Sequence, residues 1–172
     1  MSLEKNNTNY SKLAKLFHWG FVILFAYGVA KQVNDIKQLE DKFFFRFEIV
    51  FAIIFLSLLI IRFIYMKKTQ KTSIPPDVPK LQKIAAKIVQ NGMYVLLTGT
   101  VLSGLLIGFL FWLGFKNGFL IEFIIAIHEL VINILYWFIG VHILASIYHR
   151  LKKDGVWSSM VPFFKEKRRK TR

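Results

Sequence analysis

The sequence contains no cysteine. This absence excludes disulfide bonds, thiolate metal sites and iron–sulfur clusters, and it excludes the Cys-x-x-Cys-His attachment of c-type haem. Any redox cofactor of this chain must therefore be held without cysteine sulfur. Acidic residues are also scarce, since 10 Asp and Glu stand against 24 Lys and Arg and leave a formal net charge of +14.

The chain also lacks a polar segment long enough to fold alone, because the longest runs only from Lys67 to about Lys83. Each of its four long apolar blocks provides the roughly 20 residues that a helix needs to cross about 30 Å of hydrocarbon. Lipid offers the backbone no hydrogen-bond partners, so each block must be helical. The sequence predicts an all-α fold, a single-domain membrane four-helix bundle over residues 1–172. Its predicted spans are 13–33, 43–66, 88–115 and 119–148.

The basic residues are distributed unevenly between the two sides of these spans. The N-terminal segment, the second connection and the C-terminal tail hold 19 of them. Only five lie on the other side: Lys31, Lys37, Lys42, Arg46 and Lys116. By the positive-inside rule, both termini should face the cytoplasm. This distribution accounts for the high net charge, so no nucleic-acid partner is expected.

Three of the four histidines, His18, His128 and His142, lie within predicted spans. An ionisable group costs on the order of 2.5–3.5 kcal/mol there and usually faces the bundle interior. His128 and His142 are 14 residues apart, which brings them within about 40° of one helix face with a rise of roughly 21 Å. His18, early in the first span, should lie at the depth of His142.

Two imidazoles from facing helices at one depth are what a six-coordinate b-type haem requires, and a bundle core is where such a site is built. The spacing therefore favours a haem held by His18 and His142. In the alternative reading, each histidine bonds a polar group of a neighbouring helix. In the third span, Thr100, Gly104 and Gly108 are spaced four apart, which lets helix backbones approach or leaves room for a flat macrocycle.

Short motifs surround the histidines and continue beyond the fourth span. They are Ser11, Phe17-His18-Trp19, His128-Glu129, Gly140-Val141-His142, His149, Lys153-Asp154-Gly155 and Met160-Val161-Pro162. With four spans and a proline-bearing second connection, they resemble the bacterial cytochrome b561 family over nearly the whole chain. The resemblance implies a four-helix bundle in the inner membrane that holds two b haems, one near each surface. It also implies electron transfer between a quinone and a partner.

The resemblance implies roles for several residues. On the family pattern, His18 and His142 match the ligands of the inner haem, and His128 matches one ligand of the outer haem. Arg62 matches an arginine placed for haem propionates, whose carboxylates suit its planar fork; the alternative is an arginine that extends to the inner surface. His149 should lie at the inner boundary, either as a proton gate for a quinone or as an ordinary interfacial histidine.

The sequence departs from the family at the remaining ligand of the outer haem. The family has a histidine 14 residues before the arginine, and here that residue is Glu48. A carboxylate is a hard anionic group and an uncommon ligand of haem iron. Either Glu48 binds iron opposite His128, or the outer haem is five-coordinate, or the outer site is empty. Alternatively, the Glu48 carboxylate extends outward to Arg46 or Lys42.

The resemblance implies a membrane b-type cytochrome that carries electrons between the quinone pool and a small donor or acceptor. Superoxide at the outer face is one implied donor, in which case the chain is a superoxide/quinone oxidoreductase. A second hypothesis is the cytochrome b anchor of a hydrogenase or dehydrogenase complex. Those anchors usually need a docking surface for a redox partner protein, and the outer loops here are short. A third is a non-redox scaffold, supported only by Glu48.

Overall fold

The computed structural model describes residues 10–33, 35–69 and 78–162, and within these ranges every regular element is a helix. Helices α1 to α4 are long and apolar enough to cross a membrane, which confirms the prediction of an all-α membrane bundle. The proline-bearing stretch 70–77 and the basic tail 163–172 lie outside the described residues. The elements are α1 (Lys12–Ala30), η1 (Ile36–Glu40), α2 (Lys42–Thr69), α3 (Lys80–Trp112), α4 (Phe119–Lys152) and α5 (Val156–Met160).

The ends of the helices follow local chemistry rather than hydropathy. Ser11 caps α1 because its hydroxyl accepts a hydrogen bond from the Ala14 amide at 3.1 Å. Helix α3 begins directly after Pro79, eight residues before the predicted span. Its first part is amphipathic, with Leu81, Ile84 and Ile88 at helical spacing, and continues into the span as one helix. Helix α4 ends at Lys153 in the left-handed conformation, and Gly155 follows with φ +90°, which glycine adopts without steric cost.

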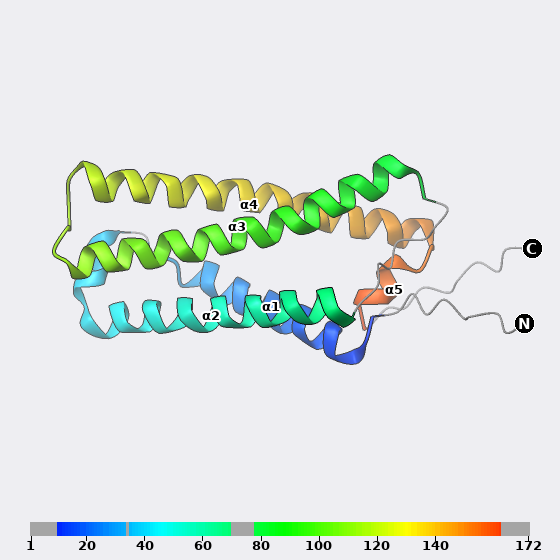
Figure 1. Cartoon of the computed structure of the whole chain (residues 1–172), viewed down its shortest axis with the longest axis horizontal. Coiled ribbons are helices and arrows are strands. Elements are labelled where there is room, and N and C mark those ends of the chain that lie inside the picture. The colour runs from blue at the N-terminus through cyan, green and yellow to red at the C-terminus, as the bar shows by residue number, and fades with distance from the viewer. Residues whose placement is uncertain (1–9, 34, 70–77, 163–172) are drawn as a thin grey trace, which may run out of the picture.

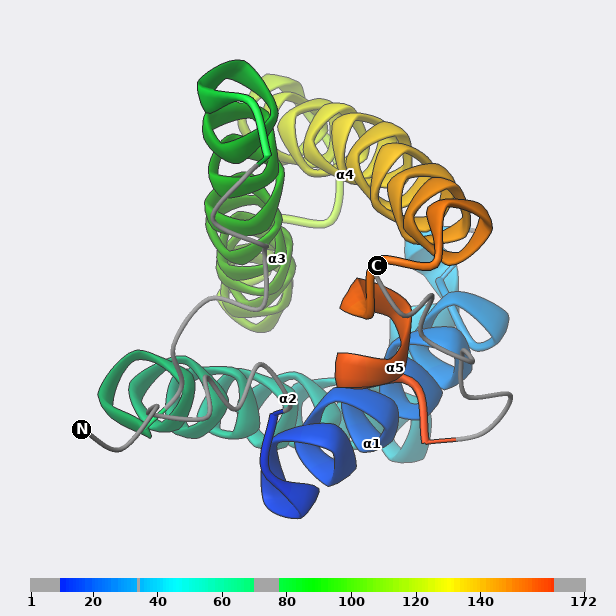
Figure 2. The same ribbon diagram turned by 90° about the vertical axis from the view of Figure 1, so that its right-hand side faces the viewer.

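The four long helices form a ring in chain order (Figures 1 and 2). Helices α3 and α4 pack together most extensively, and α2 packs on both α1 and α3. Helices α1 and α4 are packed much less closely against each other. At one end of the bundle α5 lies in the space between them, and Figure 2 shows it inside the ring.

The two ends of the bundle are named here after the short helices that they carry. The η1 end holds η1, the start of α2 and the loop between α3 and α4 (Figure 1). The α5 end holds the start of α1, the end of α2, the start of α3 and α5. Helix α5 is fastened to α1 at this end, since Lys15 Nζ donates to the Ser158 carbonyl at 3.1 Å and Trp19 Nε1 to the Met160 carbonyl at 3.3 Å.

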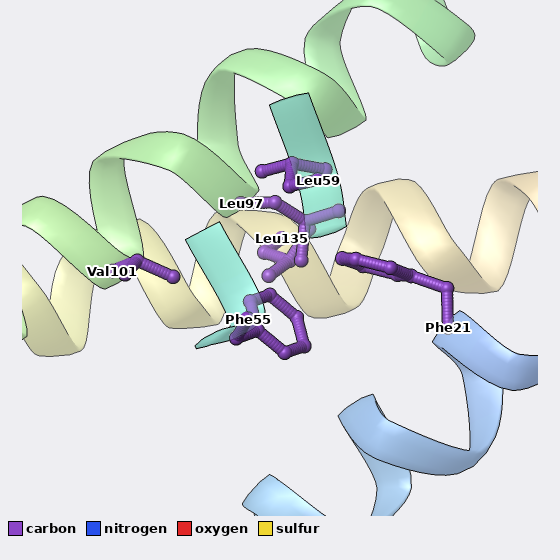
Figure 3. Packing of buried hydrophobic residues seen from close by; sticks show 6 residues of the cluster. All are labelled: Phe21, Phe55, Leu59, Leu97, Val101 and Leu135. Atoms are coloured by element: carbon purple, nitrogen blue, oxygen red, sulfur yellow. The ribbon is translucent and has the colours of Figure 1, made fainter. Parts of the chain in front are cut away.

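A small hydrophobic core lies midway along the bundle and draws on all four long helices (Figure 3). Its centre includes the rings of Phe21 and Phe55, whose centroids are 4.5 Å apart. Most other apolar side chains point outward, as suits a bundle whose surroundings are lipid. The core cluster is Phe21, Phe55, Leu59, Leu97, Val101 and Leu135.

Candidate haem sites

His18 on α1 and His142 on α4 face each other near the α5 end. Their ring centroids are 6.3 Å apart, and the ring planes are inclined by 63°. Metal–nitrogen bonds to imidazole are about 2.0 Å long, so two imidazoles on opposite sides of one metal have ring centres roughly 6 Å apart. The structure thus brings together the two histidines that sequence spacing paired, at a separation that fits one metal ion.

A bare metal ion between His18 and His142 would lack further protein ligands among the described residues. Within residues 10–33, 35–69 and 78–162, no three side chains of His, Asp or Glu converge in a group that could hold a metal. A metal between His18 and His142 would therefore bring its other ligands with it. The iron of a porphyrin does so, and the donor set fits a b-type haem.

Arg62 on α2 completes the site at the α5 end. Its Nη2 lies 3.1 Å from His18 Nδ1, and because a guanidinium can only donate, Nδ1 accepts this hydrogen bond. The guanidinium carbon lies 5.5 Å from the ring centroids of both Phe21 and Tyr94. Its Nε is buried and has no partner among the described residues. A buried cation with an unused donor is suited to a carboxylate ligand.

His149 lies in a packed junction at the α5 end rather than at an open boundary. Only 8% of the residue is exposed, and its Nδ1 lies 2.6 Å from Asp154 Oδ2. Its Nε2 lies 3.2 Å from Gln82 Nε2 on α3. These contacts connect α3, α4 and the turn before α5. Sequence reasoning missed Gln82, because nothing in its local pattern indicates a contact with a residue 67 positions away.

A cavity of about 590 Å³ opens at the η1 end, on the far side of the hydrophobic core. Its volume lies in the range of small-molecule sites. Both His128 and Glu48 line it, so the structure brings the two predicted outer-site residues to one cavity. The aromatic side chains in its wall are Phe25, Phe45, Phe51, Phe55 and Tyr136.

His128 is held by a hydrogen bond to α3. Its Nδ1 lies 2.8 Å from Ser103 Oγ, and that hydroxyl donates its single proton to the Gly99 carbonyl at 2.7 Å. The same hydroxyl also lies 3.1 Å from the Thr100 carbonyl, and the tautomer in which His128 Nδ1–H donates to Ser103 leaves Nε2 as the nitrogen available to a ligand. Gly104 allows the approach, because a Cβ there would lie 3.2 Å from His128 Cε1.

Glu48 turns toward the cavity instead of the outer basic residues. Its Oε1 is buried without a hydrogen-bond partner in the described structure, and so is Thr100 Oγ1 in the same cavity wall. No ion pair joins Glu48 to Arg46 or Lys42, which the structure describes as exposed. The reading in which Glu48 extends outward to these residues is therefore not what the structure shows.

The charge of the cavity wall is one-sided. Of the residues in the described ranges, three with carboxyl groups line it, Asp35, Glu48 and Glu129, and no Lys or Arg does. A second haem would find His128 Nε2 and enough volume there, but its two propionates would find no cation in the wall. The residues at the α5 end fit a haem, whereas those of the η1-end cavity do not fit a dianionic one.

A membrane-spanning helical bundle with two histidines that meet across its interior and an arginine beside them is the arrangement expected of a transmembrane b-type cytochrome. The family model described as prokaryotic cytochrome b561 matches residues 9–163, and the chain belongs to this family. Membership implies haem b binding and electron transfer in a membrane. Comparisons with curated proteins and with solved structures found no match.

Proposed function

We propose that this chain carries electrons between the quinone pool and a small donor or acceptor through one haem b held by His18 and His142. The chain would act as a single domain in a bacterial inner membrane, with its α5 end and both termini on the cytoplasmic side. The observation that carries the proposal is the 6.3 Å separation of two imidazoles from different helices in a cysteine-free bundle. The haem would supply one-electron chemistry, and the protein the ligands and their environment.

Arg62 would exchange one partner for another when the site is filled. Ligation through His18 Nε2 requires the ring proton on Nδ1, yet Arg62 now donates to Nδ1 at 3.1 Å. Arg62 must therefore leave His18, and its buried guanidinium is then free to bind a propionate carboxylate. The rings of Phe21 and Tyr94 would keep the cation in place during this exchange.

Neighbouring elements would keep water away from the two histidines. The hydrophobic core begins at Phe21, one helical turn from His18. On the other side, α5 lies between α1 and α4 and is fastened next to His18 through Trp19. A site enclosed in this way is dry, and burial is one of the factors that set the potential of a haem.

The charge of the η1-end cavity and the length of the loops at that end bear on which redox partners the protein accepts. The acidic η1-end cavity would repel an anion, so superoxide is a less favoured donor there than an uncharged molecule. The anchor hypothesis requires a partner protein to dock on the loops at the η1 end. These are short, since only residues 31–41 and 113–118 separate the long helices.

Purification from membranes tests the proposal. We expect a red protein with the sharp reduced α-band of a low-spin b haem and no stoichiometric partner subunits. Subunits that co-purify in fixed ratio would instead support the anchor of a larger complex. A colourless protein, when expressed with sufficient haem, would support the non-redox scaffold and refute the proposal.

A further inference from the structure

We propose that the η1-end cavity binds an uncharged aromatic molecule with hydroxyl donors, the chemistry of a hydroquinone, in the place where the family pattern puts a second haem. The inference rests on the proposed function in one respect, namely that the protein exchanges electrons with quinones. It adds a binding site, the groups that recognise the ligand and the form of the ligand that is preferred.

The size and walls of the cavity suit a flat ring. Its volume of about 590 Å³ accommodates a substituted aromatic ring. Phe45 and Phe51 on α2 and Phe25 on α1 provide aromatic faces for offset or edge contacts. Gly104 and Gly108 contribute no side chains of their own to the α3 wall. The cavity therefore offers aromatic side chains and open backbone surface to a ring.

The polar lining combines groups that both donate and accept, namely Gln32, Thr100, Asn133 and Tyr136, with carboxylates that only accept, among which Glu48 has a buried oxygen. Glu48 Oε1 and Thr100 Oγ1 are buried without partners in the described structure. The Thr100 hydroxyl can accept as well as donate, and His128 Nε2 accepts in the tautomer whose Nδ1–H donates to Ser103. Buried acceptors are costly when unsatisfied, so a ligand that donates hydrogen bonds is favoured over one that only accepts. A hydroquinone donates through two hydroxyls, whereas the corresponding quinone donates none.

Charge distinguishes this ligand from an anionic one. Asp35, Glu48 and Glu129 line the cavity, and among the residues that the structure describes no lysine or arginine lines it with them. The nearby Lys31, Lys37 and Arg46 are exposed and do not line it. Moving an anion next to uncompensated carboxylates in a low-dielectric site is strongly unfavourable. An uncharged ligand avoids this repulsion. Its hydroxyl can donate a charge-assisted hydrogen bond to the Glu48 carboxylate, which stabilises the complex.

The site can be tested by anaerobic calorimetry on the purified haem-loaded protein with duroquinol and duroquinone as probes. We expect duroquinol to bind at least tenfold more tightly than duroquinone. Glu48→Gln should weaken duroquinol binding about tenfold and leave duroquinone unchanged, since the amide keeps the shape but loses the charge. Thr100→Val should weaken duroquinol binding in the same direction. The matched control is Glu122→Gln, because Glu122 lies at the same end, accepts from the Gly118 amide and does not line the cavity.

The outcomes separate this inference from the proposed function. Duroquinol binding that is equal in the parent and in Glu48→Gln would overturn the inference. So would a second haem that is lost in both Glu48→Gln and His128→Ala. The low-spin haem spectrum, recorded on the same samples, reports on folding and on the His18–His142 site. If that spectrum is present and binding does not depend on Glu48, only the inference fails; if it is absent in the parent, the proposed function fails.

Discussion

At the scale of single residues, His18 makes two contacts in this structure, and the proposed haem would preserve one and replace the other. Its Nδ1 accepts from Arg62 at 3.1 Å, while its ring faces His142 at 6.3 Å between centroids. Iron ligation needs the second arrangement and ends the first. Arg62 would thus hold His18 in orientation before the iron is bound and pair with a propionate afterwards.

His18→Ala and His142→Ala should each abolish the dominant low-spin haem spectrum. Removal of one axial ligand leaves a buried five-coordinate iron, which becomes high-spin or loses its haem. Absorption and EPR spectra of purified variants measure this directly. His149→Ala is the control, because that side chain is engaged with Asp154 and Gln82 instead. Unchanged low-spin spectra in both ligand variants would show that the assignment is wrong.

Glu48→His should create a second low-spin haem site. A histidine at this position would face the same cavity as His128, and the substitution also removes one of the three carboxylates of the wall. We expect haem content to rise from about one to about two per chain, with a second low-spin EPR signal. Glu122→His, outside the cavity, should change neither. If Glu48→His takes up no haem but the triple variant that also carries Asp35→Asn and Glu129→Gln does, the remaining carboxylates exclude the haem; if neither does, α2 and α4 hold these positions at different depths.

Much of the site at the α5 end could be predicted from sequence, and less of the rest. Pairing His18 with His142 needed only helix periodicity and the order of the spans. The partners of His149 and His128, namely Gln82, Asp154 and Ser103, depend on how the helices rotate against each other. The one-sided charge of the η1-end cavity was also not predicted, because Asp35 and Glu129 appear unrelated to Glu48 along the chain.

At the scale of elements, hydropathy predicted the long helices well because lipid demands apolar surfaces and satisfied backbones. It places the third span at 88, eight residues after α3 begins, because Lys80, Lys83 and Lys87 lower the hydropathy of a first part whose helical spacing of Leu81, Ile84 and Ile88 still indicates an amphipathic helix. The short helices η1 and α5 were not predicted. They depend on local turns and side-chain bonds, such as Asp35 accepting from the Lys37 amide at 2.9 Å.

The close packing of α3 on α4 gives a prediction at this scale. A Cβ added at Gly92 would overlap the Phe138 ring, whereas one at Gly99 would meet Val131 at an ordinary 3.5 Å. Gly92→Ala should therefore force the Phe138 ring to move and lower stability by about 1–3 kcal/mol. Gly99→Ala should be neutral or slightly stabilising, since alanine favours helix. Thermal unfolding in detergent compares them, and equal melting temperatures would contradict the α3–α4 contact described here.

At the scale of the whole molecule, the charge asymmetry and the four spans together determine the predicted orientation. Because the chain has no cysteine, single introduced cysteines can report it without background. Lys37→Cys at the η1 end should react with a membrane-impermeant maleimide in intact cells with a permeabilised outer membrane. Lys152→Cys at the α5 end should react only after the inner membrane is opened. The reverse pattern would place the termini outside and contradict the orientation.

The two ends of the bundle differ in the charge of their interior groups and therefore in the ligands that they could hold. The α5 end combines a pair of facing histidines with a buried cation, and the η1 end combines a histidine with carboxylates only. The hydrophobic core of Figure 3 lies between them, since Phe21 contacts Arg62 while Phe55, Leu97 and Leu135 also line the cavity. One end is thus suited to an anionic haem and the other to an uncharged ligand.

The most direct test of the account is the haem content per chain of the purified parent protein, measured together with the spin state by EPR. The account predicts one low-spin haem, with at most a weaker high-spin signal from haem bound through His128. This follows from one complete histidine pair at the α5 end and a single histidine among carboxylates at the η1 end. Two low-spin haems per chain, or none, would contradict it.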